Sequence, residues 1–248
     1  MAKTALVTGA SYGIGQACAL ALARAGFDVA VSELDEKNLG DTVKKIDATG
    51  VRPLPVALDL RSQPSIEQAM RDVLAGFGQL DVLVNSAGVT LNRLALEMTA
   101  EEWDSVLDVN LKGTFFMSQQ MGRHLVATRR GGAIISVAST HGVIGFPTRS
   151  AYGISKAGIS HMTRMLAIEW AEHGIRVNAI APGTVETPTR KAFFDANPDR
   201  REVMIERVPL KRFGTAEEMA GAVAYLASPQ AAYITGQTLL LDGGLTSY

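Results

Sequence analysis

The chain has 248 residues, of which 47% are hydrophobic and 20% charged, and its formal net charge is −1. A chain of this length typically buries roughly 70 to 75% of its unfolded surface, so its core needs neither disulfides nor metals. Its 24 basic and 25 acidic residues alternate along the chain and form no basic cluster that would indicate binding to nucleic acid or to an anionic membrane.

The first half of the chain alternates short apolar runs with segments of helical spacing. Strands are predicted at residues 5–7, 28–31, 51–58 and 81–84. A glycine turn and a helix to residue 25 follow the first strand, and Gly26 closes that helix. Helices are also predicted over 62–77, entered at Ser62 or Pro64, and from an N-cap at Thr99 toward residue 129.

The second half continues the same alternation. It predicts strands at 133–137, 176–180 and 237–241, and helices at 150–173 and 216–227. The least regular stretch runs from 183 to 213, and because long loops in compact domains are usually functional, we expect a substrate lid around 184–213. Short apolar strands separated by helices predict an α/β fold, a Rossmann-type doubly wound parallel sheet of about seven strands. Without linkers or repeats, residues 1–248 are expected to form a single domain.

Two further features bear on the cellular compartment. The opening residues M-A-K-T-A-L-V-T-G carry no charged leader, and no stretch reaches the 18 or so apolar residues of a membrane span, so a cytoplasmic location is expected. The single cysteine, Cys18, excludes an internal disulfide and is predicted to be buried and inert.

The turn after the first strand reads T-G-A-S-Y-G-I-G and is the natural place for a pyrophosphate, because ligands bind beyond the carboxyl ends of parallel strands. Gly9, Gly13 and Gly15 permit a tight turn and let backbone N–H groups approach phosphate at the positive end of a helix. The spacing is not G-x-G-x-x-G, so these glycines could serve the turn alone.

Glu33 indicates which dinucleotide would bind. It falls 18 residues after Gly15, near the roughly 20-residue offset at which a carboxylate meets the adenosine ribose hydroxyls. A carboxylate there repels a 2′-phosphate, and neither Tyr12 in the turn nor Leu34 after the acid supplies a cation. We therefore predict NAD, with NADP less favoured, although Glu33 could instead be a solvated charge at a strand end.

Seven motifs, in order along essentially the whole chain, resemble those of the short-chain dehydrogenase/reductases. The segment from Thr8 to Gly15 looks like the cofactor turn of that family, Asp59-Leu60 like its adenine-contacting pair, and the segment from Asn85 to Gly88 like its N-N-A-G with serine in second place. The other four are Asn110; Ser139; Y-x-x-x-K from Tyr152 to Lys156; and N-x-x-x-P-G from Asn178 to Gly183 with Thr187 downstream, followed by the tail at 234–244.

The resemblance implies site residues. The implied catalytic residues are Asn110, Ser139, Tyr152 and Lys156. The implied cofactor-binding residues are Gly9, Ser11, Tyr12, Gly13, Ile14, Gly15, Glu33, Asp59, Leu60, Asn85, Ala87, Gly88, Tyr152, Lys156, Pro182, Gly183, Val185 and Thr187. In the family, the asparagine anchors a water that leads from the lysine to solvent.

The chemistry of three of these residues supports their assignment to catalysis independently of the resemblance. Tyr152 and Lys156 are four apart on a predicted helix and share one face. A phenol titrates near pH 10 in water, so it needs a nearby cation such as Lys156 to exchange a proton at neutral pH. Ser139, at the end of the fifth strand, can hold the substrate oxygen. Taken singly, each could be an ordinary packed or capping residue.

Together these residues predict reversible hydride transfer between NAD(H) and a secondary alcohol or its ketone. A small hydroxylated substrate is expected, a sugar, polyol or hydroxy acid, with Ser139, His141, Arg149 and Tyr152 as its candidate contacts and no metal. Phe146 and the loop residues Glu186, Arg190, Lys191, Phe193 and Phe194 are further candidates by proximity.

Two other functions stay open. One is reduction of a 3-oxoacyl thioester, in which Arg129 and Arg130 receive an acidic carrier protein rather than serving as helix-end cations. The other is a non-catalytic NAD-binding sensor, which would have a damaged catalytic set. No nucleic-acid or membrane partner is expected, and the resemblance implies a homotetramer or homodimer. Met117, Met121, Met162 and Met165 could form part of that interface or of the core.

Overall fold

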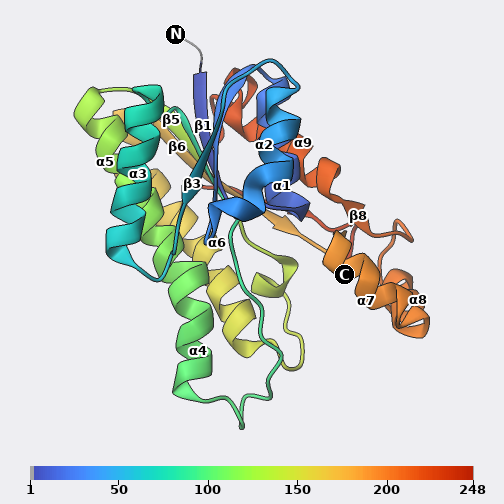
Figure 1. The fold of residues 1–248 in the computed structure, drawn as a ribbon. Helices are drawn as coiled ribbons and strands as arrows, with labels where there is room; N and C mark the ends of the chain where they lie inside the picture. The colour runs from blue at the N-terminus through green and yellow to red at the C-terminus, as the bar shows by residue number, and fades with distance from the viewer. Residues whose placement is uncertain (1–2, 248) are drawn as a thin grey trace.

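The computed structural model describes residues 3–247 and confirms the Rossmann-type α/β fold (Figure 1). One sheet holds seven parallel strands in the order β3-β2-β1-β4-β5-β6-β9. The strands are β1 (Lys3–Thr8), β2 (Phe27–Glu33), β3 (Pro53–Ala57), β4 (Val82–Asn85), β5 (Gly132–Val137), β6 (Ile175–Pro182) and β9 (Thr238–Leu241). The strand order reverses between β1 and β4, and this switch point is where such sheets bind their ligands.

Helices cover both faces of the sheet (Figure 1). On one face lie α1 (Gly13–Arg24), α2 (Gly40–Asp47) and α9 (Ala216–Ala227); on the other lie α3 (Gln63–Phe77), α5 (Thr114–Thr128) and α6 (Ser150–Trp170). Alternate side chains of β1 therefore enter two different cores, with Ala5 and Val7 in one and Leu6 in the other. Because both faces are buried, the strands read as continuous apolar runs, which is the pattern that predicted them.

The predicted helix from Thr99 toward residue 129 is interrupted. Thr99 caps α4 (Ala100–Leu107), its hydroxyl accepting from the amide of Glu102, whose carboxylate accepts in turn from the Thr99 amide. The chain then passes through a π-helical turn, Asp108–Gly113, before α5 begins. Such turns often mark functional sites in helices, and this one carries Asn110.

The segment from 183 to 213 is more regular than its composition predicts. It contains α7 (Pro188–Asp195) and α8 (Pro198–Glu206), which project beside the body of the molecule in Figure 1. Pro188 and Pro198 begin these helices rather than interrupting them, since the first helical position needs no amide hydrogen bond. Two short strands, β7 (Val185–Glu186) and β8 (Gly214–Thr215), pair with each other at the ends of the segment.

The structure also bears on the predictions made for the cysteine, the methionines and membrane spans. Cys18 is fully buried, and burial raises the pKa of its thiol to about 12. Met117, Met121 and Met162 belong to the core, whereas Met165 is half exposed. Among residues 3–247, no helix is both long and apolar enough to cross a membrane.

Candidate active site

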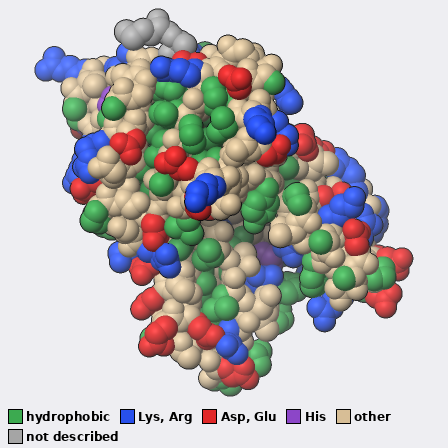
Figure 2. Space-filling view, viewed as in Figure 1, with side chains coloured by type: hydrophobic (Ala, Val, Ile, Leu, Met, Phe, Trp, Pro, Cys, Tyr) green, Lys and Arg blue, Asp and Glu red, His purple; other side chains and the backbone are tan. Residues whose placement is uncertain are grey.

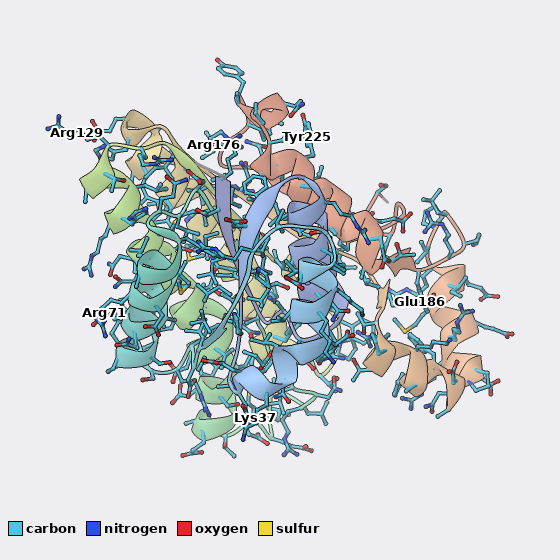
Figure 3. The ribbon with its side chains drawn as sticks, turned by 45° about the horizontal axis from the view of Figure 1, so that its top comes forward. Lys37, Arg71, Arg129, Arg176, Glu186 and Tyr225 are labelled. Carbon is cyan, nitrogen blue, oxygen red and sulfur yellow. The ribbon has the colours of Figure 1, made fainter. Side chains whose placement is uncertain are left out.

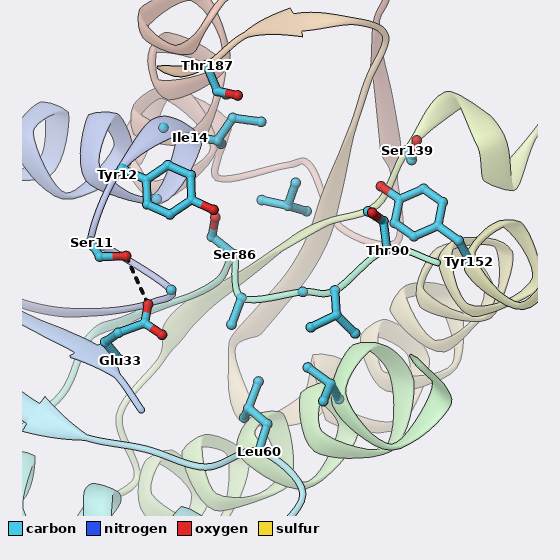
Figure 4. A pocket seen from close by; sticks show the side chains of 18 of the residues that line it. Ser11, Tyr12, Ile14, Glu33, Leu60, Ser86, Thr90, Ser139, Tyr152 and Thr187 are labelled. Atoms are coloured by element: carbon cyan, nitrogen blue, oxygen red, sulfur yellow. Dashed lines mark hydrogen bonds between the residues drawn. The ribbon is translucent and has the colours of Figure 1, made fainter. Parts of the chain in front are cut away.

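A cavity of about 1020 Å³ opens at the carboxyl edge of the sheet, beside the switch point between β1 and β4. It extends from Glu33 past the glycine turn to Ser139 and Tyr152 (Figure 4). The surface is hollowed beside the α7–α8 projection, where basic side chains and a histidine are visible (Figure 2). Ordinary ligand pockets measure about 300 to 1,000 Å³, so this one suits a long ligand. Among residues 3–247, no group of three or more acidic, histidine or cysteine side chains forms a metal site.

The glycine turn has the shape that a phosphate site requires. Gly9 and Gly13 adopt positive φ values of 64° and 61°, and a Cβ at Gly15 would overlap the carbonyl oxygen of Gly9. Helix α1 begins after Tyr12 without a side-chain cap. The first N–H groups of a helix have no partner within it, so this uncapped end can hold an anion at the cavity wall.

Helix α2 supports the glycine turn from behind, and sequence reasoning missed it. The hydroxyl of Thr42, fully buried, donates to the carbonyl of Ala10 at 2.7 Å. The amide of Gln16 donates to the Thr42 hydroxyl at 2.7 Å and to the Ser11 carbonyl at 3.2 Å. No motif in the sequence signals the two contacts of Thr42, because they join residues that are 26 and 32 positions apart.

Glu33 lies at the far end of the cavity, as the sequence predicts. Its carboxylate accepts from the Ser11 hydroxyl at 3.0 Å (dashed in Figure 4) and from the Leu34 amide at 3.2 Å. Nearby, Arg61 donates twice to Asp59, at 3.0 and 2.9 Å, and this guanidinium holds the pKa of the Asp59 carboxyl below its usual range. Arg61 is therefore paired with Asp59, whereas the hydrogen-bond partners of Glu33 are neutral groups.

Ser139, Tyr152 and Lys156 meet at the other end. Ser139 lies two residues beyond the end of β5, while Tyr152 and Lys156 lie one turn apart on α6. The ammonium of Lys156 donates to the Val137 carbonyl at 2.7 Å and lies 5.7 Å from the centroid of the Tyr152 ring. The Ser139 hydroxyl accepts from the backbone amide of His141 at 3.2 Å and lies 3.4 Å from its ring Nδ1.

The pKa of Tyr152 is shifted by burial and by neighbours other than Lys156. Burial raises the pKa of Tyr152, while the Ser139 hydroxyl and the charges of Arg149 and Arg190 act to lower it. Lys156 is not among these causes; instead, burial lowers the pKa of Lys156 to about 8. Its ammonium donates to a main-chain carbonyl and lies 5.7 Å from the centroid of the Tyr152 ring, about as far as the guanidinium of Arg149 at 5.9 Å.

Most of the expected cofactor residues line this one cavity. Those that do are Gly9, Ser11, Tyr12, Gly13, Ile14, Gly15, Glu33, Asp59, Leu60, Ala87, Gly88, Tyr152, Lys156, Pro182, Gly183, Val185 and Thr187, and the expected catalytic residue Ser139 lines it with them. Asn85, Asn110, His141 and Arg149 lie outside the lining. The lining also includes residues that had not been singled out, among them Asn38, Arg61, Ser86, Thr90, Leu91 and Val109.

The side chains of Asn85 and Asn110 bond to groups in the protein interior and do not line the cavity. Asn85 donates to the hydroxyls of Ser118 at 3.0 Å and Ser136 at 3.3 Å, so it braces β4 from inside. Asn110, fully buried, exchanges hydrogen bonds of 2.8 and 2.9 Å with the main chain of Val89. The side-chain direction at a strand end cannot be read from a motif, which is why Asn85 was expected at the cofactor.

Arg129 and Arg130 lie away from the cavity. Arg129 caps the end of α5 with φ 53°, and Arg130 pairs with Asp81 at 2.8 Å. In Figure 3, Arg129 lies across the molecule from Glu186, which belongs to the cavity side. This position fits cations at a helix C-terminus.

Comparison with known proteins covers nearly the whole chain. The family model described as enoyl-(acyl carrier protein) reductase matches residues 9–246. The 3-oxoacyl-[acyl-carrier-protein] reductase of Staphylococcus epidermidis is 41% identical over 246 residues, which are 99% of each chain.

Solved structures agree with this match. A protein from Sinorhizobium meliloti described as a short-chain alcohol dehydrogenase superposes with a TM-score of 0.95 at 42% identity, covering 99% of this chain and 96% of that one. A protein from Agrobacterium tumefaciens described as a 2-deoxy-D-gluconate 3-dehydrogenase, with bound NADP, superposes with a TM-score of 0.91 at 36% identity, covering 99% and 97%.

Proposed function

Because the chain belongs to the short-chain dehydrogenase/reductase family, whose members are oxidoreductases that bind a nicotinamide cofactor, we propose that it interconverts a secondary alcohol and a ketone with NAD(H). The substrate is a small hydroxylated compound. The observation that carries the proposal is the convergence of Ser139, Tyr152 and Lys156 at one end of a cavity whose other end presents Glu33.

Residues of the cavity suit the cofactor. The uncapped N-terminus of α1 and its glycine turn would hold the pyrophosphate, and Glu33 would accept from the ribose hydroxyls. When bound, the nicotinamide ring accepts or donates the hydride. By family resemblance, Lys156 would also bind ribose hydroxyls and Thr187 would orient the carboxamide.

The preference for NAD rests on charge. An added 2′-phosphate would meet the carboxylate of Glu33, while Arg61 on the same side is already paired with Asp59. One solved relative holds NADP, so the fold alone does not exclude NADP, and the proposal depends on the charge of Glu33 in this chain. The ratio of kcat/KM for NAD and NADP tests this point, and a clear NADP preference would overturn it.

Proton transfer is assigned to Tyr152. In oxidation, its phenolate oxygen would take the proton of the carbinol while Ser139 donates a hydrogen bond to the same substrate oxygen; in reduction, the phenol returns the proton. Burial alone would keep the phenol protonated, and the charges of Arg149 and Arg190 oppose this effect. Such general acid–base action is typically worth about 10² to 10⁴ in rate.

The test is formation of NADH, followed at 340 nm, with a panel of polyols, aldoses and hydroxy acids. We expect turnover with members of the panel, and Tyr152→Phe should lower kcat by about 10² or more while leaving NAD affinity nearly unchanged. A Tyr152→Phe variant that retains most of the activity would refute the assignment.

Reduction of a 3-oxoacyl thioester is the second candidate, favoured by the 41% identity to a reductase of that class. It would be supported if acetoacetyl thioester with NADH or NADPH were turned over more efficiently than every alcohol with NAD. The positions of Arg129 and Arg130, away from the cavity, give no support to carrier docking there. A non-catalytic sensor is disfavoured because all four catalytic positions are filled.

Two structural proposals accompany the activity. The segment 184–213 would act as a lid, since it contributes Val185, Thr187 and Arg190 to the cavity wall from one connected unit. A homodimer or homotetramer is proposed by family resemblance, and sedimentation would decide between these and a monomer.

A further inference from the structure

Two arginines lie near Tyr152 in addition to Lys156. The guanidinium of Arg149 lies 5.9 Å from the centroid of the Tyr152 ring, and Arg190 lines the cavity together with Tyr152 and Ser139. Burial lowers the pKa of Arg149, and the positive charge of Arg190 lowers it further. The two arginines come from different elements, the residue before α6 and the first turn of α7.

These two guanidinium groups have no acidic partner. Among residues 3–247, no ion pair or side-chain hydrogen bond joins Arg149 or Arg190 to a carboxylate. The acids nearby are engaged elsewhere, since Glu186 pairs with Arg201 at 2.9 Å and Glu102 pairs with Arg93. A half-buried cation without a counter-charge is unfavourable, so an anionic ligand would relieve both groups at once.

His141 completes the surroundings as a neutral group. Its ring lies 5.8 Å from the ring of Tyr152 and 5.4 Å from that of Phe146, over which the guanidinium of Arg207 lies at 5.9 Å. Burial lowers the pKa of His141, and the positive charges of Arg149, Arg190 and Arg207 lower it further. An imidazole kept neutral can donate one hydrogen bond and accept another without adding charge.

The dinucleotide itself is anionic, so its pyrophosphate is the rival ligand. Arg190 is three residues from Thr187, whose side chain lies against the glycine turn, and it could reach toward that turn. Arg149 differs, because it lies just beyond the lining of the cavity and packs on the ring that exchanges the proton, far along the chain from the glycine turn. A negative charge bound by both arginines together therefore belongs beside Tyr152, at the substrate end.

We propose that Arg149 and Arg190 bind a carboxylate of the substrate, so that the compound oxidised is a hydroxy acid whose acid group lies a few bonds from the reacting carbinol. The product is then the corresponding oxo acid, with the hydride leaving to the cofactor and the hydroxyl proton to Tyr152. This inference rests on the proposed oxidoreductase function and specifies the substrate class of the same site.

The experiment compares charged and neutral partners of the same shape. Turnover with NAD is measured for 3-hydroxybutyrate against its methyl ester, and for gluconate against sorbitol. The variants are Arg149→Gln, Arg149→Lys and Arg190→Gln, with Lys191→Gln as the matched control, since Lys191 is the exposed neighbour of Arg190 on α7 and lies outside the cavity lining. The affinity of each variant for NAD is measured separately, and circular dichroism checks that it is folded.

We expect the wild-type protein to favour at least one acid over its neutral partner by about tenfold or more in kcat/KM. Arg149→Gln and Arg190→Gln should each raise KM for that acid by about tenfold or more, while KM for the neutral partner and NAD affinity change little. Because the two charges also lower the pKa of Tyr152, kcat should fall by a similar factor for the acid and its neutral partner, so the discriminating readout is KM. Arg149→Lys should recover part of the loss, and Lys191→Gln should behave as wild type. Equal use of acid and neutral partners, or a loss of NAD affinity in both arginine variants, would overturn the proposal.

A binding measurement separates this proposal from the proposed activity. Malonate and the uncharged malonamide are titrated into the protein saturated with NADH, with heat as the readout. Binding of malonate that is lost in Arg149→Gln supports the carboxylate site even if no alcohol is turned over. Turnover of neutral alcohols without any malonate binding would support the oxidoreductase and refute the carboxylate site.

Discussion

Lys156 is a buried cation whose cost to the folded state can be measured directly. Its side chain is 4% exposed, and burial lowers its pKa from 10.5 to about 8. Each pKa unit corresponds to about 1.4 kcal/mol, so keeping this group protonated in the folded protein at pH 7 costs about 3 kcal/mol. Lys156→Met has a stem of similar length and removes that cost.

The variant also loses a contact. The ammonium donates to the Val137 carbonyl at 2.7 Å, and leaving a buried acceptor without a partner costs about 1 to 3 kcal/mol. With a loss near the middle of that range, Lys156→Met should be more stable than wild type by about 1 to 2 kcal/mol at pH 7. For a protein of this size that corresponds to a Tm higher by about 2 to 8 °C. The same variant should have almost no dehydrogenase activity.

The pH dependence gives the sharper measurement. Below pH 8, the lysine is protonated in both the folded and the unfolded protein, so the stability difference between variant and wild type is constant. Between pH 8 and 10.5, the unfolded chain holds more protons at this position, so the wild-type protein gains stability with rising pH and the difference shrinks. The free energy of unfolding is measured by urea titration without cofactor at pH 7, 8, 9 and 10, at one protein concentration.

Lys37→Met is the control, because Lys37 is exposed on the surface (Figure 3) and its loss should change stability by about 0.5 kcal/mol or less. A Lys156→Met protein that is less stable than wild type at pH 7, or a stability difference that stays constant up to pH 10, would refute this reasoning.

Three further outcomes are expected around the cofactor turn. Glu33→Gln keeps the hydrogen bond from Ser11 but removes the charge, so kcat/KM for NADP relative to NAD should rise by about tenfold or more; an unchanged ratio would mean that the carboxylate does not set the preference. Gly15→Ala places a Cβ on the turn carbonyl and should weaken NAD binding and lower the urea midpoint, whereas Gly40→Ala, with φ −54° and open space, should be neutral or stabilising. Thr42→Val removes the hydrogen bond that holds the turn to α2 and should destabilise the protein by about 1 to 3 kcal/mol and raise the Kd for NAD; an unaffected Kd would show that α2 does not shape the turn.

The sequence predicted the sheet well because its strands are buried on both faces. Residues 216–227 were predicted as a helix with the bounds that α9 has, since Thr215 and Glu218 form a capping box ahead of an apolar helix. Helix α2 was missed because only Thr42 and Ile46 are buried in it, too few for a recognisable period. The helices of the segment 183–213 were missed because their prolines read as turn signals, although proline is common in a first helical turn.

The site was predicted in outline by its motifs, but not in its electrostatics. Glycines and the Y-x-x-x-K spacing report local geometry, so the cavity lining followed from them. The direction in which Asn85 points and the identity of the cations beside Tyr152 depend on contacts between distant elements. Arg149 and Arg190 are 41 positions apart in the sequence, and only the folded chain brings Arg190 into the cavity that Tyr152 lines while Arg149 packs on the Tyr152 ring.

The pairing of β7 with β8 closes the base of the α7–α8 segment, so the ends of this segment are held together by its own flanking strands. Val185 pairs with Gly214 and Glu186 with Thr215, so the chain leaves the body and re-enters it at adjacent points. An insertion whose ends are held together can be exchanged for another of different length at little entropic cost, because closure of its base does not depend on its contents. We therefore expect residues 188–213 to tolerate changes of length and sequence, including exchange for the same segment of a relative, while Ser139, Tyr152 and the glycine turn stay in place.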